Sequence, residues 1–269
     1  MNSPEEPVMY RRALVTAFAA LAVLFLTQAP AGASGMVSLT QGSTKVNGYL
    51  ALPAVEGTYP ALVVVQEWWG LNDWVKAQAD SLAGQGYIAF APDLYKGKVA
   101  TTSEDAHQYM SGLADDEALQ ILRASADFLR SRSDVRAKAI GTIGWCMGGK
   151  YSIRLAAADP GIRAAVMYYG APITDPATIQ KIQAAVLGNF GAEDKGPTAE
   201  QVKEFRAALQ RAGKRADFKI YPKAGHAFAN VNNPWGGYRE EAARDAWVRT
   251  VAFLKKELKR APGSSGATK

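Results

Sequence analysis

The residues Gly144-Trp145-Cys146-Met147-Gly148 place the only cysteine of the chain between two glycines. This spacing matches the nucleophile-elbow pattern G-x-S-x-G, with a thiol in place of the hydroxyl, in which the central residue stands on a strained turn between a strand and a helix. Glycine answers a steric need in this turn, because a Cβ at Gly144 or Gly148 would clash where strand and helix pack together. The pattern predicts a nucleophilic cysteine whose thiolate is favoured by the helix N-terminus. The alternative is a buried structural thiol, since free cysteine is among the most buried residue types.

Two segments further along the chain carry residues that could activate such a thiol. Asp194 and His226 each follow an apolar run that is typical of a buried strand. A nucleophile, then an acid, then a histidine is the chain order of α/β-hydrolase triads, in which the acid orients the imidazole and the imidazole moves the proton. We therefore expect Cys146, His226 and Asp194 to meet at one edge of a sheet.

Each of these partners also has a structural interpretation. His226 alone could be a core or loop histidine, and Asp194 alone could cap a helix. Glu193 is the nearest alternative acid, and Asp175 is a weaker one. The joint occurrence after successive strands, in the right order, favours the triad.

A carboxylate and two tryptophans follow the apolar run 61–66, which reads as a strand buried on both faces of a parallel sheet. Open α/β sheets place their ligands at the carboxyl ends of such strands. Glu67, Trp68 and Trp69 are therefore candidate site residues. The alternative is that Glu67 is a solvated loop acid and that the two tryptophans only pack.

The elements that must position these residues alternate along the chain. This alternation, without a linker or an internal repeat, predicts one α/β-hydrolase fold, with a mostly parallel central sheet and helices on both faces. A β-hairpin is expected at its start, at 36–40 and 44–52. The remaining expected strands are 61–66, 87–91, 139–144, 163–169, 184–190 and 217–221, and the expected helices include 103–110, 115–130, 147–158 and 199–212.

Composition limits the possible partners. Lysine and arginine exceed aspartate and glutamate by 31 to 25, and the densest basic cluster, 255–260, reads as the end of a helix, so we expect no nucleic-acid partner. One cysteine excludes an internal disulfide, and with two histidines no zinc cluster of the usual kind can form. We expect no metal and no cofactor, and we expect a monomer.

The N-terminal residues read as an export signal. Arg11 and Arg12 precede an apolar run, and Ala31-Gly32-Ala33 is a small-residue cleavage site. We therefore divide the chain into a signal peptide, 1–33, a single domain, 34–261, and a disordered tail, 262–269. The protein is then periplasmic or secreted, with no stable membrane insertion after cleavage. An uncleaved anchor is the alternative, although the run is short for a span of roughly 20 residues, and Sec or twin-arginine export stays open.

Taken together, these motifs resemble the dienelactone hydrolase family of α/β-hydrolases, in which cysteine replaces the usual serine. The resemblance covers approximately residues 37–258. It rests on five segments in order: Gln66-Glu67-Trp68-Trp69-Gly70; Gln85-Gly86-Tyr87 with Ala91-Pro92-Asp93-Leu94-Tyr95; Gly144-Trp145-Cys146-Met147-Gly148-Gly149; Gly191-Ala192-Glu193-Asp194; and Ala224-Gly225-His226-Ala227-Phe228.

The resemblance implies a function and a set of roles. It implies that Cys146, His226 and Asp194 hydrolyse an ester or lactone through an acyl-thioester. It also implies an oxyanion hole from the backbone N–H groups of Met147 and Trp68. For Glu67 it implies a thiol-tuning role, which would keep the resting thiol protonated.

We also expect a substrate pocket lined by five side chains. These are Trp69, Tyr95, Trp145, Phe228 and Asn230.

One residue departs from the family pattern. Family members that cleave the anionic ring-fission lactone hold its carboxylate with arginines, and here Asn230 stands where one is expected. A neutral or differently charged small-molecule ester or lactone is therefore the expected substrate. A thioesterase or acyltransferase on the same fold, or a catalytically silent binding protein, are the alternatives.

Overall fold

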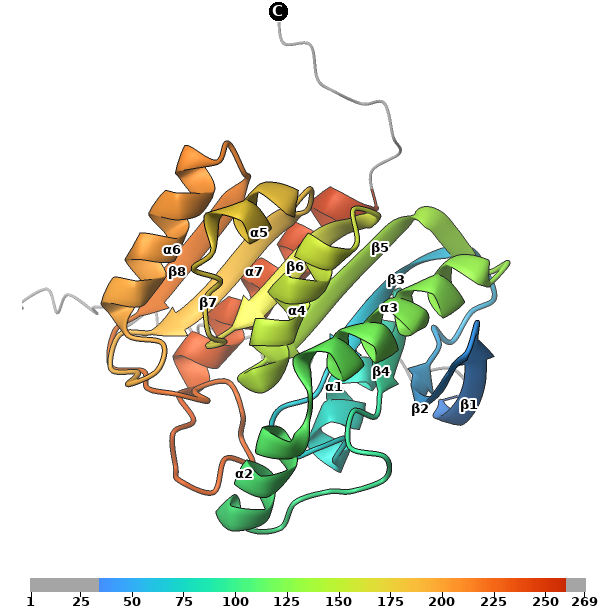
Figure 1. Cartoon of the computed structure of the whole chain (residues 1–269), viewed down its shortest axis with the longest axis horizontal. Coiled ribbons are helices and arrows are strands. Elements are labelled where there is room, and N and C mark those ends of the chain that lie inside the picture. The colour runs from blue at the N-terminus through green and yellow to red at the C-terminus, as the bar shows by residue number, and fades with distance from the viewer. Residues whose placement is uncertain (1–33, 260–269) are drawn as a thin grey trace, which may run out of the picture.

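The computed structural model describes residues 34–259, so the expected signal peptide and the expected tail lie outside the described residues. Its centre is an eight-stranded sheet (Figure 1). The strands are β1 (Gly35–Gln41), β2 (Thr44–Ala51), β3 (Tyr59–Val65), β4 (Ile88–Pro92), β5 (Val135–Trp145), β6 (Ile162–Tyr168), β7 (Ala185–Gly191) and β8 (Ala216–Tyr221). Their order across the sheet is β1-β2-β4-β3-β5-β6-β7-β8. The pairs β1–β2 and β2–β4 are antiparallel and all later pairs are parallel.

Helices cover both faces of the sheet, as Figure 1 shows. They are α1 (Asp73–Gly84), α2 (Ser103–Gly112), α3 (Asp115–Ser131), α4 (Met147–Ala158), α5 (Pro176–Lys181), α6 (Ala199–Arg211) and α7 (Glu240–Leu258). The buried residues of α3, α4, α5 and α6 belong to one core cluster, and those of α1 and α7 belong to a second. The predicted α/β-hydrolase fold is confirmed.

The sheet separates these two cores because side chains alternate along each strand. In β3, Val63 and Val65 lie in the cluster beneath α3 and α4, whereas Leu62 and Val64 lie in the cluster beneath α1 and α7. All four are fully buried, which explains why this strand reads as a continuous apolar run.

The predicted hairpin and most predicted elements are confirmed. β1 pairs with β2 through a register that ends at Gln41 opposite Thr44, and Gly42 in the turn has a φ of 59°. The short helix α5 was not predicted from the sequence. Its N-cap is Asp175, whose carboxylate accepts hydrogen bonds from the N–H groups of Ala177 and Thr178. Within residues 34–259, no helix combines the length and apolar character needed to cross a bilayer.

Candidate active site

Cys146 lies at the turn between β5 and α4 with a backbone φ of 53° and ψ of −119°. A positive φ is strained for a residue with a side chain, so the surrounding structure must hold it in place. The N–H of Cys146 donates to the carbonyl of Tyr168 at 3.0 Å, and the thiol is only half-buried. The elbow expected from the glycine spacing is present.

The two flanking glycines allow backbone to touch backbone. A Cβ added to Gly144 would lie 2.2 Å from the carbonyl oxygen of Gly148, and one added to Gly148 would lie 2.2 Å from the carbonyl oxygen of Val65. The predicted steric need for glycine is confirmed. The second contact also sets the first turn of α4 directly against the segment that follows β3.

His226 and Asp194 meet at the carboxyl edge of the sheet. His226 follows β8, Asp194 follows β7, and His226 Nδ1 lies 2.9 Å from Asp194 Oδ2. The second oxygen of Asp194 accepts from the N–H of Gly196 at 2.9 Å, which fixes the carboxylate. Glu193 is exposed, so it lacks the burial of Asp194, which is 5 % exposed.

The electrostatic environment of His226 favours its charged form. Burial of the ring disfavours an imidazolium, but the hydrogen bond with Asp194 and the negative charges of Asp194 and of an ionised Cys146 outweigh it. When Cys146 is ionised, the pKa of His226 is thereby raised to about 10, so the imidazole can hold the proton that the thiol gives up. The imidazole thus contacts the Asp194 carboxylate directly and lies within electrostatic reach of Cys146.

Glu67 is a buried acid beside this group, 2 % exposed. Burial raises its pKa to about 7, although hydrogen bonds from Asn230 and Tyr169 and the charge of His226 lower it in part. Asn230 Nδ2 donates to Glu67 Oε2 at 2.6 Å, and Tyr169 Oη donates to Glu67 Oε1 at 3.4 Å. Glu67 is therefore not a solvated loop acid.

Tyr169, which follows β6, was not among the predicted site residues. It is fully buried with a φ of 38°, and its ring centroid lies 5.2 Å from that of His226. A tyrosine directly after an apolar strand, at the edge that carries Cys146 and His226, was the available signal. Its hydroxyl donates to Glu67 and its ring packs against that of His226, so Tyr169 joins these two residues.

The two expected oxyanion donors lie on neighbouring segments. Met147 is the first residue of α4, where N–H groups have no acceptor within the helix. Trp68 follows β3, close to the backbone that Gly148 touches. Tyr95 also reaches this point, because its hydroxyl donates to Met147 Sδ at 3.3 Å.

The expected substrate pocket needs correction at three positions. Trp145 is 1 % exposed and packs against Trp74 and Tyr168, and Phe228 is fully buried against Tyr169. Both fill the core beneath α1 and α7 and do not face an open site.

Asn230, 2 % exposed, holds Glu67 and is not an open pocket wall. Trp69 is half-buried beside Trp68, so it stays available to a ligand.

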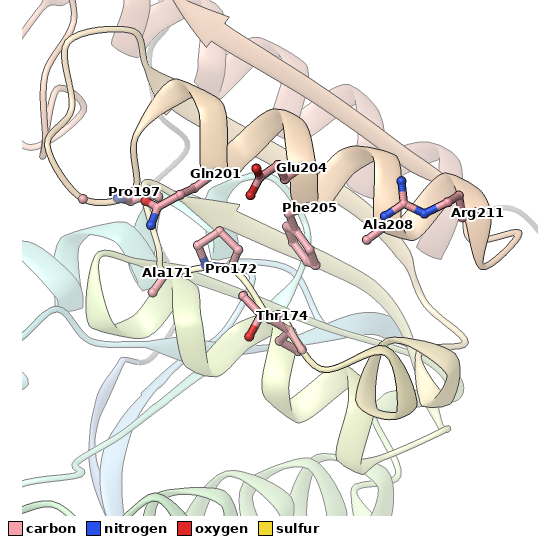
Figure 2. Close-up of a pocket in the computed structure, with 11 residues that line it drawn as sticks. Ala171, Pro172, Thr174, Pro197, Gln201, Glu204, Phe205, Ala208 and Arg211 are labelled. Carbon is pink, nitrogen blue, oxygen red and sulfur yellow. The ribbon is translucent and has the colours of Figure 1, made fainter.

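A cavity of about 760 Å³ lies between α6 and the segment after β6 (Figure 2). No residue of the expected site lines it. It is connected to the site through Gly196, which lines the cavity and donates its N–H to Asp194. Within residues 34–259, no group of three His, Cys, Asp or Glu side chains is placed to hold a metal ion.

Comparisons with known proteins agree with this geometry. The family model described as "Dienelactone hydrolase family" matches residues 46–258. A Methylorubrum extorquens protein named "Putative carboxymethylenebutenolidase" is 31% identical over 82% of this chain and 80% of its own length. A Bradyrhizobium protein named "Probable 2-oxo-3-(5-oxofuran-2-ylidene)propanoate lactonase" is 30% identical over 81% of this chain and 92% of its own.

A solved structure gives the same result. The crystal structure titled "Putative Dienelactone Hydrolase" from Klebsiella pneumoniae superposes with a TM-score of 0.76 at 28% identity, over 83% of this chain and 98% of that one. The family match covers most of the chain, and strands β3 to β8, the elbow and the carboxyl-edge site lie within it. The chain belongs to the dienelactone hydrolase family.

Proposed function

We propose that the protein hydrolyses an ester or lactone of a small molecule through Cys146, His226 and Asp194. The observation that carries this proposal is the 2.9 Å contact between His226 Nδ1 and Asp194 Oδ2. It lies at the same edge of the sheet as the elbow, close enough for the charge of an ionised Cys146 to raise the pKa of His226. A nucleophile, a base and an orienting acid in contact are what acyl transfer needs.

The reaction then has two halves. Cys146 Sγ attacks the carbonyl carbon, and its proton goes to His226. The tetrahedral species collapses when the C–O bond breaks and the imidazolium protonates the departing alcohol oxygen, which leaves an acyl-thioester. A water then gives its proton to His226 and attacks the thioester carbon. The C–S bond breaks, the imidazolium returns the proton to the sulfur, and the carboxylic acid departs. Asp194 holds the imidazole throughout.

The N–H groups of Met147 and Trp68 stabilise the oxyanion in both halves. A donor of this kind contributes on the order of 3 kcal/mol in other enzymes. Glu67 opposes thiolate formation when it is ionised, because like charges repel. We infer that it keeps the resting thiol protonated, which protects an exported cysteine from oxidation.

We expect the part of the natural substrate that lies nearest Glu67 to be uncharged. Asn230 occupies the position where an arginine would be expected, and its amide is already used by the Glu67 carboxylate. A carboxylate placed there would meet the acid Glu67, and the side chain at position 230 would offer it no positive charge. The Bradyrhizobium relative is named for a lactone that carries a carboxylate, and we expect this chain to prefer uncharged esters or lactones.

Turnover of p-nitrophenyl acetate tests the function. We expect wild-type protein to hydrolyse it and Cys146→Ala to lose the activity. Mass spectrometry of the rapidly quenched wild type should show an acetyl group on Cys146. Full activity in Cys146→Ala would refute the mechanism. Products transferred to added alcohols or amines would indicate an acyltransferase, and turnover of thioesters but not esters would indicate a thioesterase.

The role of Glu67 has its own test. The rate at which iodoacetamide alkylates Cys146 is measured across pH in wild type and in Glu67→Gln. We expect faster alkylation of the variant at neutral pH, because the opposing charge is gone. Identical profiles would remove Glu67 from the mechanism.

We further propose that residues 1–33 direct export and are then removed. Mass spectrometry of the protein purified from an exporting host should give a chain that starts at Ser34. Protein that is found in the cytoplasm and still carries residues 1–33 would refute this proposal.

A further inference from the structure

Three tryptophans gather beside the candidate active site, and one of them is largely open to solvent. Trp235, in the segment between β8 and α7, is 57 % exposed. Its ring centroid lies 5.6 Å from that of Trp68 and 5.7 Å from that of Trp69, which are 5.1 Å from each other. We call these three residues the tryptophan cluster.

The cluster joins two segments that carry residues of the candidate site. Trp68 and Trp69 directly follow Glu67, on the segment that lies against the first turn of α4. On the other side, the segment of Trp235 runs past His226, since a Cβ added to Gly237 would lie 2.8 Å from the His226 carbonyl oxygen. Trp235 therefore spans the two segments that supply Glu67 and His226.

Hydrogen bonds fix this segment to the site. Asn232 N donates to Asn230 Oδ1 at 2.8 Å and Asn233 N donates to Asn230 O at 3.1 Å. Trp235 N donates in turn to Asn233 Oδ1 at 3.2 Å. Asn230 itself donates to Glu67, so these hydrogen bonds link the segment of Trp235 to the buried carboxylate of the site.

An indole held in place with most of its surface exposed gives a ligand a large apolar face. Ligand sites are typically lined by aromatic side chains with a few polar groups. Aromatic rings whose centroids lie about 4.5–7 Å apart also gain interaction free energy in addition to that from the apolar area they bury. The cluster shows this spacing within itself. A flat ligand group beside Trp235 would meet three preassembled rings that are tilted by 44–63° to one another.

We propose that the tryptophan cluster binds an aromatic or flat unsaturated group of the substrate, and that Trp235 determines the preference for it. This inference rests on the proposed ester or lactone hydrolysis, because the cluster is placed to hold the acyl group of a substrate whose carbonyl is at Cys146. Trp235 is a specificity residue and takes no part in proton transfer.

Hydrolysis of two neutral methyl esters tests the inference. Methyl phenylacetate presents an aromatic acyl group and methyl hexanoate presents a flexible aliphatic one. We expect Trp235→Ala to lower kcat/KM for the phenylacetate roughly two- to tenfold, mainly through KM, which corresponds to the strength of one aromatic pair. The hexanoate should change less, and Trp235→Phe should restore most of the difference.

Val248→Ala is the matched control. Val248 is 61 % exposed, and it lies on α7 outside the cluster, so its removal should leave the ratio of the two esters unchanged. If Trp235→Ala leaves the ratio of the two kcat/KM values unchanged, whether or not both values fall, the inference is overturned while hydrolysis stays established.

A binding measurement separates the inference from the proposed reaction. Phenylacetamide and hexanamide are titrated by NMR into Cys146→Ala, with and without Trp235→Ala. Weaker phenylacetamide binding in the double variant, with no comparable loss for hexanamide, supports the cluster even if the wild type hydrolyses no ester. Equal binding of phenylacetamide to both proteins overturns the inference even if hydrolysis is found.

Discussion

The burial of Glu67 makes the stability of the fold depend on pH in a defined direction. Burial raises its pKa from 4.5 to about 7. Between these values the folded protein keeps a proton that the unfolded chain has released, so the free energy of unfolding falls by about 1.4 kcal/mol for each pH unit. The stabilisation is fully present below pH 4.5, and it is lost as the pH rises through about 7. The whole interval is worth about 3 kcal/mol.

Glu67→Gln removes this dependence and keeps the local contacts. The glutamine oxygen can accept from Asn230 as the carboxylate does, and its NH₂ group can donate to the hydroxyl of Tyr169. We expect the variant to be about as stable as wild type near pH 4 and more stable by about 3 kcal/mol near pH 8.

Urea unfolding followed by circular dichroism gives the two free energies at each pH. Glu193→Gln serves as control because it removes an exposed acid two positions beyond β7, outside the buried site. If the difference between Glu67→Gln and wild type stays constant from about pH 4 to about pH 8, burial of Glu67 does not make stability depend on pH.

Three further substitutions test the site. Asp194→Asn should lower kcat on the order of 10²- to 10⁴-fold, as losing the orienting acid does in other triads, whereas Glu193→Gln should leave turnover near wild type; steady-state kinetics with the reverse ranking would reassign the acid. Gly148→Ala should destabilise the fold by about 3 kcal/mol, and Gly112→Ala, whose Cβ meets nothing within 4 Å, should change it by about 0.5 kcal/mol or less; equal melting temperatures would contradict the steric argument. Asn230→Ala should raise the pKa of Glu67 further, because it removes a donor to the carboxylate; an unmoved carboxyl titration in NMR would show that this hydrogen bond is weak.

Much of this fold could be predicted because its signals are local. An apolar run such as that of β3 fits only a strand covered on both faces. In a parallel sheet the carboxyl ends of the strands share one edge, so Cys146, Asp194 and His226 could be placed together without knowledge of their loops. The glycines beside Cys146 carried the same kind of local information.

The contacts around Glu67 could not be predicted in this way. Asn230 lies 163 positions from Glu67 along the chain, and the loops that join them follow no periodic pattern. Trp235 was missed for the same reason, because its partners Trp68 and Trp69 come from the opposite side of the site.

The placement of Trp145 was wrong although a signal was present. Ile143 lies two residues before it on β5, and side chains two apart share a face. Both residues belong to the core beneath α1 and α7. The period of the strand thus sends this tryptophan into the core, away from the edge that carries the thiol.

The start of α4 packs backbone against backbone, which limits how far the nucleophile can move to fit a different substrate. Gly148 touches the backbone at the end of β3, and a Cβ on Gly149 would lie 2.7 Å from the carbonyl oxygen of Tyr168. At both glycines, backbone therefore packs directly on backbone with no side chain between. The sulfur is consequently a fixed reference point above the sheet. Accommodation of differently shaped molecules falls to the longer connections that bear the imidazole and the exposed indole, and new selectivity is most readily engineered there.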